Sequence, residues 1–307
     1  MKRVLLVGGA GNLGFEIISK PNKDVNYAVI DDFSSSAVTK DEISIHSEYV
    51  LDGDVSDLDQ LHGLFDQFRP TDVYYLATNL GNDQQKQFES NVYGLRNTMT
   101  LGEKFGQPHI YYFQSFLTRD TSQAIDEFTN IRALDSYSTW KLAGEFLLKS
   151  YRGPHTNIIL GSVLTSRLNL GLIPTLIARI SQGQSISITP STRDYVSPSD
   201  FHDSLQKVLW SEIHPQTLVL GSEISMSSET ILLLLCDILK IDKSSLDVNF
   251  VSMSASNPAS IELKRGEFFE SVSKTHNSDL IAALENIVSF QSQNNSTIRQ
   301  HHDLESK

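Results

Sequence analysis

Tyr137 and Lys141 are the residues of this sequence whose types and spacing best suit chemistry. They lie four positions apart in the segment YSTWK, so a helix would place both side chains on one face. A free tyrosine has a pKa near about 10 and is a weak base at neutral pH, but an adjacent ammonium stabilises the phenolate and lowers that pKa. The pair can therefore take a proton from a hydroxyl group as hydride leaves the same carbon.

A glycine-rich stretch near the start of the chain, VLLVGGAGNLG at 4–14, predicts where a diphosphate-bearing cofactor binds. Four apolar residues can form a short buried strand, and Gly8, Gly11 and Gly14 then recur at every third position before a potential helix start. Glycine permits the sharp turn, the approach of the backbone to a pyrophosphate and the close packing of helix on strand. Free N–H groups at the helix start would face the phosphate oxygens. A strand, a glycine turn and a helix in this order predict a dinucleotide site.

An acidic residue at the end of the second predicted strand indicates which dinucleotide binds. Asp31 follows the apolar run at 27–30, in the region where a carboxylate accepts hydrogen bonds from the ribose hydroxyls. It would repel a 2′-phosphate, and no arginine follows it directly, so NAD is favoured over NADP. Asp32 could share this role. The positive nicotinamide ring of NAD would also favour the Tyr137 phenolate.

The elements that must position these residues alternate between strand and helix over the first half of the chain. Further apolar runs predict strands at 46–51, 72–77 and 110–113, and apolar residues at helical spacing predict helices at 58–68 and 88–106. This alternation indicates an α/β fold of the Rossmann type, with a doubly wound parallel sheet covered on both faces.

The second half of the chain is less regular. Strands are expected at 157–160, 185–188 and 217–220, and helices at 171–183, 200–210 and 230–239. We expect residues 1–160 to form the NAD-binding domain, with returns to it near 185–220. Residues 161–290 should form mainly a smaller α/β substrate lobe. From residue 291 to 307 the chain is polar without an apolar period, which predicts a tail that lacks regular structure.

The composition excludes several other classes of protein. A formal net charge of −12 argues against a nucleic-acid partner. One cysteine among 307 residues excludes a disulfide framework, and the nine histidines show no paired metal-ligand spacing, so no metal is expected. No apolar run is long enough to cross a bilayer, so no membrane partner is expected and the cytoplasm is the predicted location.

Motifs that follow in order from residue 8 to residue 200 carry a family resemblance: Gly8-x-x-Gly11-x-x-Gly14, Asp31, Gly53-Asp54-Val55, Leu76-Ala77, Asn91-Val92, Ser115, Tyr137-x-x-x-Lys141 and Arg193-Asp194-Tyr195-Val196. With them the chain resembles the extended, atypical short-chain dehydrogenase/reductases of the NAD-dependent epimerase/dehydratase family. The resemblance implies a catalytic set of Ser115, Tyr137 and Lys141. It also implies that NAD is held by Gly8, Gly11, Asn12, Leu13, Gly14, Asp31, Asp32, Asp54, Val55, Leu76, Ala77, Asn91, Tyr137 and Lys141.

The substrate implied by the resemblance is a nucleotide-diphosphate sugar. Arg193 would bind its diphosphate, for which a bidentate guanidinium is well suited; the alternative is an ion pair between Arg193 and Asp194. Thr78, Thr118 and Ser162 complete the expected substrate-binding set. Ser162 occupies the place of an asparagine in the family, and Thr165-Ser166 replaces a glycine-proline pair.

The sequence departs from the family around its third catalytic residue. The family's pair of hydroxyl residues at the end of the fifth strand is Gln114-Ser115 here, so Ser115 is expected to bridge the substrate oxygen and Tyr137. Thr118 is the second candidate for this hydroxyl. The usual Val-Tyr-Gly is missing between Ser115 and Tyr137, which predicts a reshaped loop that sets substrate specificity.

Three functions are compatible with these residues. The first is a nucleotide-sugar epimerase acting at C4 through a transient 4-keto sugar, similar to the epimerases of bacterial polysaccharide and lipopolysaccharide pathways. The second is a reductase that uses NADH on a 4-keto sugar, and the third is a non-catalytic protein that binds the dinucleotide. A 4,6-dehydratase is disfavoured because the Thr-Asp-Glu of that branch reads Ser-Phe-Leu here. The resemblance further implies a homodimer, formed through the helices that carry Asn91 and Tyr137.

Overall fold

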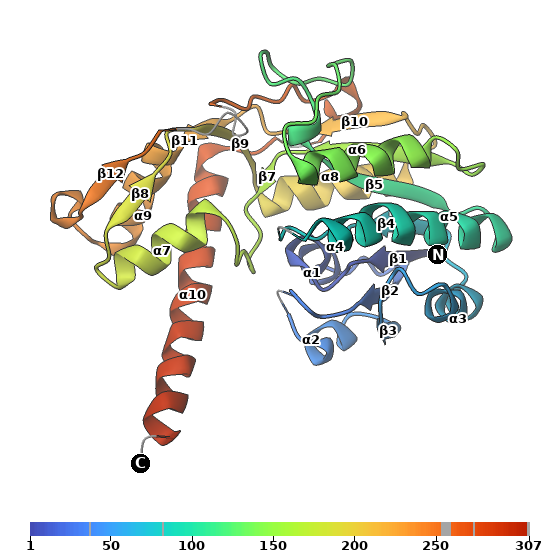
Figure 1. Cartoon of the computed structure of the whole chain (residues 1–307), viewed down its shortest axis with the longest axis horizontal. Helices are drawn as coiled ribbons and strands as arrows, with labels where there is room; N and C mark the ends of the chain where they lie inside the picture. Colours follow the sequence, from blue (N-terminus) through green and yellow to red (C-terminus); the bar gives the residue numbers. More distant parts are fainter. Residues whose placement is uncertain (37, 82, 253–258, 273, 306–307) are drawn as a thin grey trace.

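A parallel sheet of seven strands forms the centre of the protein (Figure 1). A computed structural model describes residues 1–36, 38–81, 83–252, 259–272 and 274–305. The strand order is β10-β6-β5-β4-β1-β2-β3, and every pair is parallel. The strands are β1 (Lys2–Val7), β2 (Val25–Asp31), β3 (Tyr49–Asp52), β4 (Asp72–Tyr75), β5 (His109–Ser115), β6 (His155–Leu160) and β10 (Thr217–Leu220). The predicted doubly wound Rossmann fold is confirmed.

Helices cover both faces of this sheet because its strands are apolar on both sides. One face packs on α1 (Asn12–Ile18) and α8 (Pro198–Trp210). The other face packs on α3 (Leu58–Phe68), α5 (Leu95–Lys104) and α6 (Ser136–Leu148). Buried residues alternate between the two cores along β1, β2, β4 and β5, as the pleat requires.

The helix expected at 88–106 contains a π-helical turn. It begins earlier, as α4 (Gln84–Phe88), continues as the π-helical segment η1 (Glu89–Gly94) and becomes α5. The Tyr75 hydroxyl donates to the carbonyl of Ser90 within this turn. A Cβ on Gly94 would lie 2.4 Å from Val55 and 2.6 Å from the Tyr75 hydroxyl, so only glycine permits this close approach. Such π turns are often found at functional sites.

The second lobe has its own core beside the carboxyl end of the sheet (Figure 1). It contains a three-stranded sheet of β7 (Ser162–Val163), β9 (Thr192–Val196) and β11 (Ser225–Ser227), and a pair of β8 (Ile186–Ile188) with β12 (Val248–Phe250). Its helices are α7 (Leu172–Ser181), α9 (Ser228–Leu239) and α10 (Asn277–Glu305). Short elements complete the chain: α2 (Lys40–Ser44), η2 (Phe116–Thr118), η3 (Lys243–Ser245) and η4 (Glu267–Phe269).

Residues 291–305 differ from their expected structure. They continue α10 as a helix that projects beyond the second lobe, so the prediction of an irregular tail is wrong for this range. The first half of α10 is anchored by the buried residues Leu280, Leu284 and Ile287. A helix that is already nucleated extends at little cost through polar residues. Within the described residues, no helix is long and apolar enough to cross a membrane.

Candidate active site

The three glycines of the turn after β1 meet different surroundings. Gly8 has a φ of +80°, and a Cβ there would lie 2.5 Å from the backbone of Ala77. A Cβ on Gly14 would lie 2.3 Å from the carbonyl oxygen of Gly9. A Cβ on Gly11 would meet only the Gly8 carbonyl, at 3.7 Å. Gly8 and Gly14 therefore shape the turn, whereas Gly11 faces open space that a diphosphate can enter.

The start of α1 is tied to the second lobe. Asn12 donates from its side-chain amide to Asn169 at 3.0 Å, while Leu13 packs against the neighbouring core. One turn later, the buried Glu16 accepts two hydrogen bonds of 3.1 Å from the amide and hydroxyl of Ser166. Ser166, the second residue of the pair that replaces the family's glycine-proline, therefore ties this segment of the second lobe to α1.

Asp31 lies at the tip of β2 and faces the glycine turn. Its carboxylate accepts the amide N–H of Ala10 at 2.9 Å and that of Phe33 at 2.9 Å. Burial raises the pKa of Asp31, and the two amide bonds oppose that rise. The Asp32 carboxylate instead accepts from the amide and hydroxyl of Ser34. Of the two candidates, Asp31 is the one that is held against the turn.

The loop after β3 packs on the helices of the same face. Asp54 accepts the amide of Ser56 at 2.7 Å, and Val55 is buried. Asn97 on α5 donates to the carbonyl of Ser56 at 2.7 Å. The loop that holds Asp54 and Val55, two of the predicted NAD-binding residues, is thus fixed by an asparagine that sequence reasoning did not identify.

The end of β4 borders the same region. The amides of Leu76 and Ala77 both donate to the carbonyl of Val7 at 2.8 Å. Asn91, fully buried in the π-helical turn, donates to the carbonyl of Gln87 at 2.9 Å and lies 3.4 Å from the Thr78 hydroxyl. The predicted cofactor residues of β1, β2 and β4 therefore lie at the carboxyl edge of the sheet.

Ser115 and Tyr137 meet at this edge. Ser115 ends β5, and Tyr137 lies in the first turn of α6, whose start is capped by Asp135 and Ser138. The side chains of Ser115 and Tyr137 are neighbours, close enough for the serine to act on the pKa of the phenol. Burial raises the pKa of Tyr137 to about 12, and the neighbouring Ser115 side chain works against that rise. The serine hydroxyl therefore favours the phenolate that a general base needs.

Lys141 is the third member of the group. Its ammonium donates to the carbonyl of Phe113 at 3.0 Å and lies 4.9 Å from the centroid of the Tyr112 ring. Burial lowers the pKa of Lys141 to about 7. A desolvated cation one helical turn from Tyr137 is stabilised by any negative charge that forms on the phenol.

Thr118 does not reach the cleft as the sequence suggested. Its side chain is fully buried, and its hydroxyl donates to the carbonyl of Ser115 at 2.6 Å and accepts from Arg119 at 3.0 Å. Both bonds point into the protein. The Thr118 hydroxyl is therefore engaged within the protein, whereas the Ser115 side chain lies beside Tyr137.

A cleft of about 610 Å³ opens between the two lobes. Tyr137 lines it on the side of the sheet, and Ser162 and Arg193 line it on the side of the second lobe. Most of the remaining wall is aliphatic and comes from residues 163–173. The wall also contains hydroxyl groups, from Ser187, Thr189, Ser191 and Tyr195. A cleft that combines an apolar wall with convergent polar groups is typical of a small-molecule site.

Arg193 and Asp194 make separate contacts on β9. Arg193 donates to the carbonyl of Thr192 at 2.8 Å, and burial lowers its pKa. The fully buried Asp194 accepts the amide of Ser222 at 2.8 Å and that of Glu223 at 2.9 Å. Burial raises the pKa of Asp194 to about 6. Asp194 thus anchors the strand from behind while Arg193 lines the cleft.

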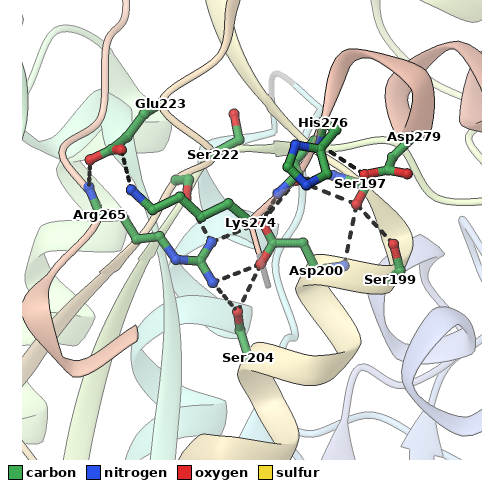
Figure 2. Close-up of polar contacts among 12 residues, drawn as sticks. Ser197, Ser199, Asp200, Ser204, Ser222, Glu223, Arg265, Lys274, His276 and Asp279 are labelled. Carbon is green, nitrogen blue, oxygen red and sulfur yellow. Dashed lines mark hydrogen bonds and ion pairs between the residues drawn. The ribbon is translucent and has the colours of Figure 1, made fainter. Parts of the chain in front are cut away.

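A buried ion pair between Arg265 and Asp200, drawn in Figure 2, lies close to this anchor. Glu223, which bonds Asp194 through its backbone, accepts hydrogen bonds from the backbone N–H of Arg265 at 3.2 Å and from the ammonium of Lys274 at 2.6 Å. The Arg265 guanidinium pairs with Asp200 of α8 at 2.7 and 2.8 Å and also donates to Ser204 at 2.9 Å. Hydrogen bonds therefore run from β9 in the second lobe to α8 on the Rossmann sheet.

Sequence reasoning missed this network and had little chance of finding it. Arg265 and Asp200 are 65 positions apart, and neither lies in a motif. Glu145 was also missed, but the sequence contains a signal for it. It follows Lys141 by four positions and therefore shares the helix face of Tyr137 and Lys141. A charged residue on the inward face of a helix indicates a buried partner, which here is Arg119.

Comparison with known proteins gives a family match over most of the chain. The sequence model of the NAD dependent epimerase/dehydratase family matches residues 4–221. A search of curated proteins finds no match to the chain.

Solved structures share the fold at low sequence identity. The Bordetella bronchiseptica enzyme WbmG in complex with NAD and UDP is 24% identical, covers 94% of each chain and has a TM-score of 0.83. UDP-glucose 4-epimerase of Thermus thermophilus with NAD is 18% identical, with 94% of this chain and 99% of that chain covered and a TM-score of 0.83. The dTDP-glucose 4,6-dehydratase of Bacillus anthracis with NAD is 14% identical, with 96% and 97% covered and a TM-score of 0.81. At these identities the likeness concerns the fold.

Proposed function

Because the chain belongs to the NAD dependent epimerase/dehydratase family, we propose that this NAD-dependent enzyme epimerises a nucleotide-diphosphate sugar at C4 through a transient 4-keto sugar. One observation carries the proposal: Ser115 and Tyr137 are neighbours, Lys141 lies one turn along the helix, and the cleft beside Tyr137 also contains Arg193. That arrangement offers a base for a sugar hydroxyl and a guanidinium for a diphosphate. A role in bacterial surface-polysaccharide synthesis and a cytoplasmic location belong to the same proposal.

The residues at the carboxyl edge fit NAD. The open space at Gly11 would take the diphosphate. The Asp31 carboxylate, held against the glycine turn, would accept hydrogen bonds from the ribose hydroxyls. The adenine would lie beside Asp54 and Val55. The path of the diphosphate towards Lys141 would be bordered by Leu76, Ala77 and Asn91. Asp31 favours NADH over NADPH, which titration of the two coenzymes tests; tighter binding of NADPH would exclude this role.

Each side chain of the group has a distinct part in the reaction. Tyr137 takes the O4 proton, and the Ser115 hydroxyl bridges the substrate oxygen and the phenol. The Lys141 ammonium stabilises the phenolate, and Arg193 holds the diphosphate while the 4-keto sugar turns. Bound NAD supplies the hydride acceptor and donor at C4. Tyr137 then returns the proton, so the reaction consumes no cofactor, in contrast to the reductase alternative.

The two glycines of the turn allow a test of cofactor binding. Gly11→Ala should change the free energy of unfolding by less than about 1 kcal/mol, because its Cβ meets only one atom, at 3.7 Å. It should weaken NAD binding by at least about tenfold, since the methyl group occupies the diphosphate space. Gly14→Ala is the matched control and should destabilise the protein by about 1–3 kcal/mol through its 2.3 Å contact. Thermal unfolding with and without NAD measures both effects, and unchanged NAD affinity in Gly11→Ala would contradict the placement.

The helices beside the site support a homodimer. Tyr93 and Phe146 are 40% and 52% exposed on η1 and α6. Phe88 packs between Tyr93 and Trp140, with ring centroids 5.1 and 5.0 Å apart. Aromatic side chains gathered on neighbouring helices suit a protein interface. Light scattering tests this proposal, and a monomeric mass at micromolar concentration would contradict it.

A further inference from the structure

Gln114 occupies the position where the family resemblance leads one to expect a hydroxyl, and its side chain is buried between two catalytic elements. The side-chain oxygen Oε1 of Gln114 accepts a hydrogen bond from the backbone N–H of Ser115 at 3.0 Å. Its amide nitrogen donates to the carbonyl of Lys141 at 3.1 Å and to the carboxylate of Glu145 at 3.0 Å. One side chain therefore bonds the backbones of both Ser115 and Lys141.

A buried ion pair completes the connection. Arg119 and Glu145 form two parallel hydrogen bonds of 3.0 Å each, and their side chains are 3% and 7% exposed. The same guanidinium donates to the hydroxyl of Thr118 at 3.0 Å. That hydroxyl in turn donates to the carbonyl of Ser115 at 2.6 Å. Ser115 is thus fixed at its N–H by Gln114 and at its carbonyl by Thr118.

We propose that Gln114, Arg119 and Glu145 form a clamp whose function is to hold the Ser115 hydroxyl on Tyr137. This clamp is a set of positioning residues, because its members act through Ser115 and Lys141. The inference rests on the proposed function, in which Tyr137 is the base. Fixing two reacting groups in one geometry contributes strongly to rate, and a displacement of about 1 Å can cost a hundredfold.

The simpler alternative is that the clamp only stabilises the fold. Buried ion pairs with full hydrogen bonding occur for that reason alone. The three hydrogen bonds of Gln114 argue for more, because each ends on a residue of the catalytic group or on Glu145. A purely structural role predicts lower stability without any change at Tyr137.

Gln114→Met tests the clamp while keeping the volume of the side chain. In the NAD-loaded protein, kcat should fall by about ten- to a hundredfold while KM changes by less than about threefold. The rising limb of the pH profile should move to higher pH, since displacement of the Ser115 side chain raises the pKa of Tyr137. Gln216→Ala, an exposed glutamine before β10, is the control and should behave as wild type.

A second readout does not depend on turnover. In protein with isotope-labelled tyrosine, the Cζ resonance that disappears in Tyr137→Phe reports whether the Ser115 side chain contacts the phenol. Gln114→Met should shift this resonance in the same direction as Ser115→Ala. An unshifted resonance together with an unchanged pH profile would overturn the clamp. If the wild-type protein converts no nucleotide sugar, the proposed function fails, and the resonance still decides whether the clamp positions Ser115.

Discussion

The Tyr137→Phe protein should convert its nucleotide sugar about a thousandfold more slowly than the wild type, within the range of about 10²–10⁴ for loss of a general acid or base. The substitution removes one hydroxyl from a half-buried ring and leaves the Lys141 contact with Phe113 in place. Stability should therefore stay close to wild type. Initial rates followed by NMR, together with thermal unfolding, measure the two quantities separately.

Tyr49→Phe is the matched control for this variant. Tyr49 is a half-buried tyrosine on β3, an edge strand of the sheet, where its ring packs against Phe68. Its loss of a hydroxyl should leave turnover unchanged. If Tyr137→Phe retained activity within severalfold of wild type, another group would have to be the base, and the assignment of Tyr137 would be wrong.

The second large effect concerns the ion pair between Arg265 and Asp200. Arg265→Met should lower the free energy of unfolding by about 3–5 kcal/mol, because it leaves the Asp200 carboxylate buried without its cation. Both side chains are 1% exposed, and Arg265 also donates to Gly221 and Ser204. Urea unfolding of wild type and variant measures the difference. A loss below about 1 kcal/mol would show that the pair contributes little.

Two further variants separate the buried pair from ordinary surface charge. Lys274 pairs with Glu223 nearby, but the two side chains are 49% and 42% exposed, so Lys274→Met should cost less than about 1 kcal/mol. The double variant Arg265→Met with Asp200→Leu should recover part of the loss, since it leaves no unpaired buried charge. No recovery would mean that the hydrogen bonds of Asp200 to Thr275 matter more than the pair itself.

The sequence predicted the sheet better than the second lobe for a physical reason. Strands of the central sheet are buried on both faces and appear as apolar runs, such as 4–7 and 27–30. Strands β9 and β11 contain arginine, aspartate and serines among their few residues. In β9, Arg193 lines the cleft and Asp194 bonds the 222–223 turn behind it. The apolar pattern of both strands is too short to stand out, and neither was predicted.

The motif residues were found because the chemistry requires particular residue types at particular spacings. Gly8, Asp31, Tyr137 and Lys141 all lie at the carboxyl edge of the sheet or beside it. The residues that hold them in place were not found, because tertiary contacts select them. Gln114 was noticed only as a departure from the family pattern, and its reason lies in hydrogen bonds to a helix 27 to 31 positions away.

The central claim is that this protein epimerises a nucleotide sugar without consuming cofactor. The most direct measurement is proton NMR of the NAD-loaded protein with a panel of UDP-, GDP-, CDP- and dTDP-sugars. We predict that at least one sugar gives a new set of ring-proton signals with the coupling pattern of its C4 epimer, while no net NADH accumulates. Conversion that depends on added NADH, or a complete absence of new sugar signals across the panel, would contradict the account.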